Sequence, residues 1–388
     1  MNPRFAASWP RMACCGLLFL GFAGIAAAQG GKPTVHFAGI AYTGAADQAG
    51  TRAPYTQAAI SSRGDLALNA QLLQALSDRP PANFMVEAGT LASLDGTGSA
   101  VAMAVAIDRE TVVVEPLAGQ YKLLFELAGQ ALFFDFEERQ VLFSYPLTLQ
   151  RIELLPEPPS EARKQQIAHD ILFDGRASGL PLALAEELAG LTLPSASARR
   201  LQITSVHLPD ALAQRLPASV DGDLIGHEFS KILAARLRLP LLPYQSGQAI
   251  AGAMSARFAD GSVYNLSIPD ADYTIALEIS DFREKTLKQT PAFRQQLYGA
   301  FFDVRVEEPL SAQVFFDQPL RQGATKTIPA SQDRVDTGAA YYETLLAGLS
   351  SLAVASAGEN NDWAREQPGG RLFNKQLKSL KELIDQCR

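Results

Sequence analysis

The sequence predicts an α/β fold of the α+β kind, built as two similar tandem domains, each a mixed or mostly antiparallel sheet with packed helices. Two observations lead to this prediction. Strand and helix patterns follow one another in the same order in two segments of the chain, and the tripeptide Gly-Asp-Leu opens a helix in both. The matched stretches are 34–37 with 205–208, 64–66 with 222–224, and 132–135 with 314–317. Because repeats determine architecture, we expect an internal duplication.

The first half is expected to begin with a strand, a polar loop and a helix that Asp65 caps and whose apolar face includes Leu66. A meander of short strands follows, with turns at 108–110 and 137–139. Ser160 then caps a helix that ends near residue 173. The expected ranges are a strand at 34–42, a loop at 45–63, a helix at 66–76, and strands at 84–86, 101–107, 111–114, 121–127, 131–136 and 141–145.

The second half repeats this order. Asp223 is expected to cap a helix that Pro240 stops, and Tyr273 begins a strand that alternates apolar and polar residues. Residues 282–297 look like an insertion, helical and solvated. The other expected ranges are strands at 201–208, 273–279, 300–306, 312–316 and 324–328, helices at 224–237 and 339–352, and a short connecting helix near 182–188.

Three matched pairs of residues support the predicted repeat. Phe133 and Phe134 match Phe315 and Phe316 in the two Phe-Phe-Asp stretches. Adjacent strand residues point to opposite faces, so one phenylalanine of each pair is expected to face away from the main core. A helix covers that side chain, or it lies on a contact surface. His36 and His207 occupy matching places in the two opening strands.

The first residues have the pattern of a secretory signal peptide. Arg4 and Arg11 precede an apolar run at 15–25, and Ala28 ends a row of small residues after which we expect cleavage. The run is shorter than the ~20 residues needed to span a bilayer. The expected organisation is a signal peptide at 1–28, a first α/β repeat domain at 29–176, a connector at 177–199, a second α/β repeat domain at 200–355, and a polar linker with a C-terminal amphipathic helix at 356–388. The predicted location is the periplasm, with secretion as the alternative.

The mature chain is acidic. Removing Arg4 and Arg11 from the 34 basic residues leaves 32 against 41 acidic ones, a net charge of −9. An acidic surface repels phosphate backbones, so nucleic acid is excluded as a partner. No further apolar stretch reaches spanning length, so no transmembrane segment is expected in the mature chain. Cys387 alone remains of the cysteines and is expected to be incidental on a frayed terminus, with pairing to another chain as the alternative.

No pattern for catalysis, a cofactor or a metal ion is found. The histidines lack the spacing of metal ligands, and no H-E-x-x-H or G-x-S-x-G motif is present. The glycines at 95–99 are followed by neither lysine nor helix, which favours a turn over a phosphate loop. We therefore predict no catalytic residues, no cofactor and no metal ligands, which favours a non-enzymatic protein. The four histidines are His36, His169, His207 and His227.

The C-terminal residues 371–384 predict an amphipathic helix. Its apolar residues recur at intervals of three and four, whereas its lysines lie largely on the other side. Two interpretations stay open: the helix docks onto the second domain, or it binds a partner or the membrane surface. The candidate contact surface consists of Leu372, Phe373, Leu377, Leu380 and Ile384.

The order of elements resembles a known family of envelope proteins. The helix entered at Gly222, the stretch 222–244 and the strand at 270–275 are similar to the α/β domain of the curli-secretion lipoprotein family and the amino-terminal domain of the Tol-system propeller protein. The resemblance implies a binding domain of the cell envelope. Pore formation is not implied, because no lipid-attachment cysteine follows the signal and no pair of membrane-crossing hairpins is evident.

These observations predict an exported soluble periplasmic protein, a non-catalytic binding or assembly accessory of the cell envelope with a protein partner. The sheet edges, the cleft between the two repeats and the C-terminal helix are the surfaces expected to make contact. The alternative is an exported enzyme or small-ligand-binding protein with a site in that cleft, formed by His36, His207 and Asp223.

Overall fold

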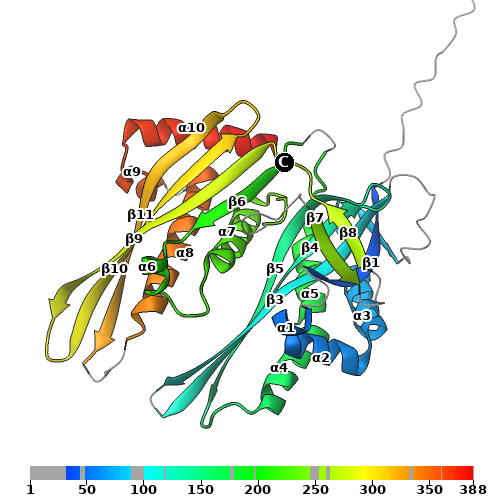
Figure 1. Cartoon of the computed structure of the whole chain (residues 1–388), viewed down its shortest axis with the longest axis horizontal. Coiled ribbons are helices and arrows are strands. Elements are labelled where there is room, and N and C mark those ends of the chain that lie inside the picture. Colours follow the sequence, from blue (N-terminus) through cyan, green and yellow to red (C-terminus); the bar gives the residue numbers. More distant parts are fainter. Residues whose placement is uncertain are drawn as a thin grey trace, which may run out of the picture. The chain divides into compact units, whose positions relative to one another are not determined.

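Two β-sheets, each with helices packed against it, make up the part of the chain that the structure describes (Figure 1). The structure is a computed structural model that describes residues 32–43, 49–88, 100–117, 119–174, 179–195, 198–244, 253–258, 263–330, 332, 335–359 and 361–387. The predicted signal peptide and the predicted turn at 95–98 lie outside these residues. The fold is the α/β (α+β) class that the sequence predicts.

The first sheet has seven strands in the order β2-β1-β3-β4-β5-β8-β7, and β7 also pairs with β1. Strand β1 runs parallel to β2 and β3, whereas β3, β4 and β5 form an antiparallel meander. The hairpin β7–β8 comes from the second half of the sequence. The strands are β1 (Thr34–Thr43), β2 (Met85–Ala88), β3 (Val101–Leu117), β4 (Gln120–Asp135), β5 (Gln140–Leu155), β7 (Ala253–Phe258) and β8 (Val263–Ser267).

The second sheet has four strands in the order β11-β10-β9-β6. Strand β6 runs parallel to β9, and β9, β10 and β11 form an antiparallel meander. Both sheets therefore place an opening strand parallel to the first strand of a three-stranded meander. The strands are β6 (Leu201–His207), β9 (Tyr273–Gln289), β10 (Phe293–Glu308) and β11 (Gln313–Pro329).

The helices follow the predicted order, and most begin close to the expected residue. Ser160 caps α4, since its hydroxyl accepts from the backbone N–H of Arg163 at 3.2 Å. The cap of α7 is Asp221, which accepts from the N–H of Leu224 at 2.7 Å, so the expected cap at Asp223 is wrong by two residues. The helices are α1 (Ala49–Arg52), α2 (Pro54–Arg63), α3 (Asp65–Asp78), α4 (Glu161–Phe173), α5 (Leu180–Ala189), α6 (Asp210–Ala213), α7 (Gly222–Leu237), α8 (Thr337–Ser356), α9 (Asn361–Glu366) and α10 (Arg371–Gln386).

The two sheets differ in how their faces are covered. In the first sheet Phe133 is buried beneath the helices and stacks on Phe143 at 4.5 Å, while its neighbour Phe134 is buried on the other face, in a cluster that includes Leu266 of β8. In the second sheet, burial on β10 alternates strictly from Tyr298 to Val306, which is the pattern of a sheet covered on one face. Helix α8 packs on that face (Figure 1).

The predicted turn at 108–110 and the predicted helix at 282–297 are both wrong. Strand β3 runs through 108–110 with a register shift between Ile107 and Arg109, so three long strands replace five short ones. Residues 282–297 belong to the hairpin β9–β10 instead. Phe282 and Tyr298 point inward and contact the ring of Tyr341 on α8, at 5.1 and 5.7 Å. Burial of these two rings stabilises the hairpin, so the charged residues that suggested a solvated helix do not determine the local structure.

The predicted loop at 45–63 contains α1 and α2. The carboxylate of Glu110 on β3 accepts from the backbone N–H groups of Tyr55 and Thr56, at 3.0 and 2.8 Å, and so satisfies the first turn of α2. The next helix, α3, has Gly64 rather than Asp65 as its N-cap. Leu66, expected on the apolar face of this helix, is 80% exposed, because it lies off the face formed by Leu68, Leu72 and Leu76.

Two of the sequence matches between the halves do not occupy equivalent positions. Residues 133–135 end β4, the second meander strand, whereas 315–317 lie near the start of β11, the third. His36 pairs with Ala102 near the start of β3, but His207 ends β6, opposite Glu278. Buried strands favour aromatic residues wherever they occur, so the Phe-Phe pairs reflect burial and not register.

Candidate functional site

The C-terminal helix α10 packs its apolar side chains against β11 and α8. Phe373 is fully buried, with its ring 5.8 Å from that of Phe316 and 6.2 Å from that of Trp363. Leu380 and Ile384 are buried too, and Leu377 is partly buried against the same cluster. Leu372 is the member of the predicted contact surface that remains exposed, at 55%. The other four side chains pack into the protein's own core. The helix is therefore docked onto the second sheet and α8.

The end of the chain is held in place, so the expected frayed terminus is wrong. The backbone N–H of Arg199 donates to the carbonyl of Gln386 at 3.1 Å, and the hydroxyl of Tyr273 donates to the Gln386 side chain at 2.8 Å. Cys387 is 1% exposed, and burial raises the pKa of its thiol to about 12. This cysteine is therefore part of the hydrophobic core between the second sheet and its helices.

Strand β11 is an edge strand, and the C-terminal segment covers its outward backbone groups from Asp317 to Arg321. Gln367 accepts from the N–H of Arg321 at 2.9 Å and donates to its carbonyl at 3.2 Å, as a neighbouring strand would. Gln376 accepts from the N–H of Asp317 at 3.1 Å. Between them, Pro319 has no N–H to present. We call this stretch of β11, from Asp317 to Arg321, the covered edge.

Strand β5 is the corresponding last strand of the first meander, and no comparable pair of glutamines covers its outer half in the described part of the chain. Ser144 exchanges two backbone hydrogen bonds with Leu241, at 2.7 and 3.3 Å, so its backbone points away from β4. The register is regular from there to the end of the strand, and alternate residues therefore also point outward. The first of these is Pro146, without an N–H. The next four are Thr148, Gln150, Ile152 and Leu154.

No hydrogen bond from the described part of the chain reaches the outward backbone groups of these four residues. Ile152 and Leu154 are 59% and 58% exposed, so the strand also presents apolar side chains to solvent. Thr148 faces α7 across a small cavity, so we call residues 150–154 of β5 the open edge. An unpaired edge with exposed apolar residues is a template for pairing with another strand.

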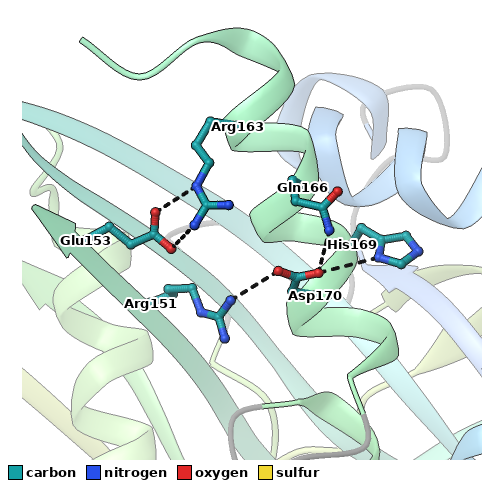
Figure 2. Close-up of polar contacts among 6 residues, drawn as sticks. All are labelled: Arg151, Glu153, Arg163, Gln166, His169 and Asp170. Carbon is teal, nitrogen blue, oxygen red and sulfur yellow. Dashed lines mark hydrogen bonds and ion pairs between the residues drawn. The ribbon is translucent and has the colours of Figure 1, made fainter. Parts of the chain in front are cut away.

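The helix-facing side of the same strand is held firmly by charges on α4 (Figure 2). Arg163 donates to both carboxylate oxygens of Glu153, at 2.8 and 2.6 Å. Arg151 lies 3.3 Å from Asp170, which also accepts from Gln166 at 2.7 Å. The open edge is thus part of a strand that α4 braces on one face.

The cleft expected between the halves is tightly filled where β5 meets α7. A cavity of about 20 Å³ remains there, lined by Ser144, His227 and Tyr244 among others, which is room for about one water. Two charged residues of its lining, Lys231 and Glu228, pair at 3.0 Å. Arg109 on β3 also lies 3.9 Å from Asp221, next to α7. A larger surface hollow of about 800 Å³ lies between the ends of α5 and α7.

The structure does not bring together the three residues suggested for a site in this cleft. His36 is half-buried in β1 of the first sheet, and His207 is exposed at the end of β6 in the second. Asp223 lies in the first turn of α7. Burial raises the pKa of the Tyr244 hydroxyl, and the negative charge of Asp223 raises it further. Among the residues that the structure describes, no three His, Cys, Asp or Glu side chains are placed to share a metal ion.

Sequence reasoning named sheet edges in general and did not single out Ile152 or Leu154. A signal was present, because Pro146 and Pro319 mark the outward positions of edge strands. In the described ranges, none of the helices has both the length and the hydropathy required to cross a bilayer.

Comparison with known proteins finds weak likeness. No protein-family model matches the chain, and neither does any curated protein. Solved structures that resemble parts of it include a Xanthomonas campestris protein described as DUF330, a minor lipoprotein of Acinetobacter baumannii and a PelC dodecamer of Paraburkholderia phytofirmans. They are 10%, 13% and 15% identical, with TM-scores of 0.24, 0.19 and 0.17. The matches cover 41%, 40% and 41% of this chain and 86%, 86% and 90% of the others.

Proposed function

We propose that this chain is an exported periplasmic protein that acts by binding, as a non-catalytic assembly accessory of the cell envelope. The open edge of β5 carries the proposal. It combines exposed Ile152 and Leu154 with backbone donors and acceptors that no described residue pairs with, on a strand that α4 holds rigid. A preorganised strand costs little ordering entropy when a second strand adds to it. Export is supported by the basic and apolar pattern of residues 1–28.

The C-terminal helix is a weaker candidate for the binding surface. Removing it would expose Phe316 and the covered edge, so a truncated chain would report on folding and not on binding. Leu372 is the position on this helix where a change tests binding without disturbing the core.

Site-specific cross-linking in intact cells tests the proposal. A photoreactive amino acid placed at position 152 is expected to capture envelope protein, whereas the same group at Leu310, which is 99% exposed in the turn between β10 and β11, is expected to capture little. The mass of the cross-linked chain also reports whether residues 1–28 have been removed. Equal yields at the two positions, or an uncleaved chain retained in the cytoplasm, would contradict the proposal.

We also propose that the two halves descend from one duplicated α/β unit, with domains at 29–176 and 200–355. The support is topological: in each half an opening strand lies parallel to the first strand of a meander, and a helix follows that meander. The duplication is tested by superposing β1, β3, β4 and β5 on β6, β9, β10 and β11 in an experimental structure. A common core that aligns only with a different strand order would refute the duplication.

A further inference from the structure

We propose that the open edge of β5 pairs with the same edge of a second copy of this chain, antiparallel and about a two-fold axis at Ile152. The inference rests on the proposed role of this edge as a contact surface and names its partner. It joins the two first sheets into one continuous sheet across the dimer.

The backbone defines a window of the right length for this pairing. The inner end of the edge is closed by the Ser144–Leu241 bridge and by Pro146, and the strand ends at Leu155, before Pro156. Thr148 faces α7 across a small cavity, so the window begins after it. The outward residues Gln150, Ile152 and Leu154 each have an N–H and a carbonyl with no partner among the described residues. With the axis at Ile152, the Ile152 pair and the two Gln150–Leu154 pairs each exchange two backbone hydrogen bonds.

Charge selects this register among the symmetric alternatives. With the axis at Ile152, Arg151 of one copy lies opposite Glu153 of the other, and both are already oriented by α4 (Figure 2). An axis at Arg151 or at Glu153 would instead place like charges directly opposite each other. An axis at Leu154 would run the pairing into Pro156, and an axis at Gln150 would run it into Pro146 and lose hydrogen bonds. The sequence Arg-Ile-Glu is thus self-complementary about its central residue.

The edge of β11 is a poor partner for β5 in a head-to-tail assembly. Gln367, Gln376 and Pro319 occupy its covered edge. Beyond Arg321, outward N–H groups remain at Gly323, Thr325 and Thr327 before Pro329, and the carbonyl of Gly323 already accepts from Gln322. These residues offer no large apolar side chain, unlike Ile152 and Leu154.

Disulfide trapping of the purified mature chain tests both the pairing and its register. Opposite residues in a hydrogen-bonded antiparallel pair have Cα atoms about 5.5 Å apart, within the range of a disulfide. Ile152→Cys is therefore expected to give a covalent dimer under mild oxidation. Leu154→Cys is the matched control, because its two copies would be offset by ~13 Å along the strands. Leu310→Cys measures random collision, and the buried Cys387 is common to all three variants.

Sedimentation across a range of protein concentrations supplies a second measurement. Ile152→Lys is expected to weaken self-association about tenfold or more, since each copy then brings a charge into the pairing window, whereas Leu310→Lys should leave it unchanged. Equal cross-linking of I152C and L154C would overturn the register, and a wild-type chain that stays monomeric would overturn the pairing. A monomeric chain whose position 152 still captures another envelope protein in cells would remove this inference and leave the proposed function standing.

Discussion

The last strands of the two meanders, β5 and β11, are alike in place but differ in what covers their outward edge. Both carry a proline at an outward position, Pro146 and Pro319, which is a common way to weaken an exposed edge. On β11 the segment after α8 adds two glutamines that take the place of a neighbouring strand. On β5 the chain leaves through α4 and α5 toward the second sheet, and nothing in the described ranges replaces that cover.

The residues after α8 cover an edge strand and fill a core, and the described part of the first half has no equivalent segment. The C-terminal segment closes an edge and a core together, because Phe373 fills the core beneath β11 while Gln367 and Gln376 meet its backbone. An edge strand without such a segment is expected to be short, to twist away from other strands, or to serve as a binding surface. The exposed side chains of Ile152 and Leu154 favour a binding surface on β5.

The largest expected effect comes from undocking the segment that covers β11. Phe373→Ala should lower the free energy of unfolding by about 3–5 kcal/mol, because it empties a fully buried aromatic position between Phe316 and Trp363. Leu372→Ala, one residue away but exposed, should change it by no more than about 0.5 kcal/mol. Chemical denaturation measures both. Similar losses for the two variants would mean that α10 is not held through its predicted apolar side.

A smaller effect is expected when the strand-like contact alone is removed. Gln367→Ala leaves the N–H and carbonyl of Arg321 without their partner, which should cost about 1–3 kcal/mol. It should also increase self-association, because the covered edge becomes available. Glu366→Ala, at an exposed neighbouring side chain, is the matched control. Destabilisation without new association would show that Pro319 is sufficient to protect the edge.

The pattern of the sequence was enough to predict most elements but not the fate of their edges. Capping at Ser160, the 3–4 spacing of residues 371–384 and the stop at Pro240 are local signals, and each corresponds to an observed helix boundary or face. The hairpin β7–β8 joining the first sheet, and the turn of Phe282 toward Tyr341, depend on contacts between residues distant in sequence. Edge exposure likewise depends on which strands become neighbours. Pro146 is a local sign of an edge strand, but no local pattern shows that Ile152 stays uncovered.

The thiol of Cys387 offers a probe of the same segment, with a modest effect. Its folded pKa of about 12 lies above its ordinary value of 9.0, so the native chain keeps the proton where the unfolded chain releases it. The stability contributed by burying the thiol is therefore full below pH 9 and is lost as the pH rises toward about 12. Labelling at pH 8 should be slow in the native protein and faster in Phe373→Ala. Rapid labelling of the unaltered chain would show that α10 detaches readily.

The smallest expected effect concerns the stability of the monomer when the open edge is altered. Ile152→Ala should change the free energy of unfolding by no more than about 0.5 kcal/mol, because the side chain is mostly exposed and its outward backbone groups have no partner among the described residues. Leu149→Ala on the helix-facing side of the same strand should cost about 2–5 kcal/mol, since that side chain is buried. The measurement is made at high dilution, where pairing between copies adds nothing to stability. A large loss for Ile152→Ala under these conditions would mean that the side chain supports the fold of the monomer, and β5 would then resemble β11 in being covered from within its own chain.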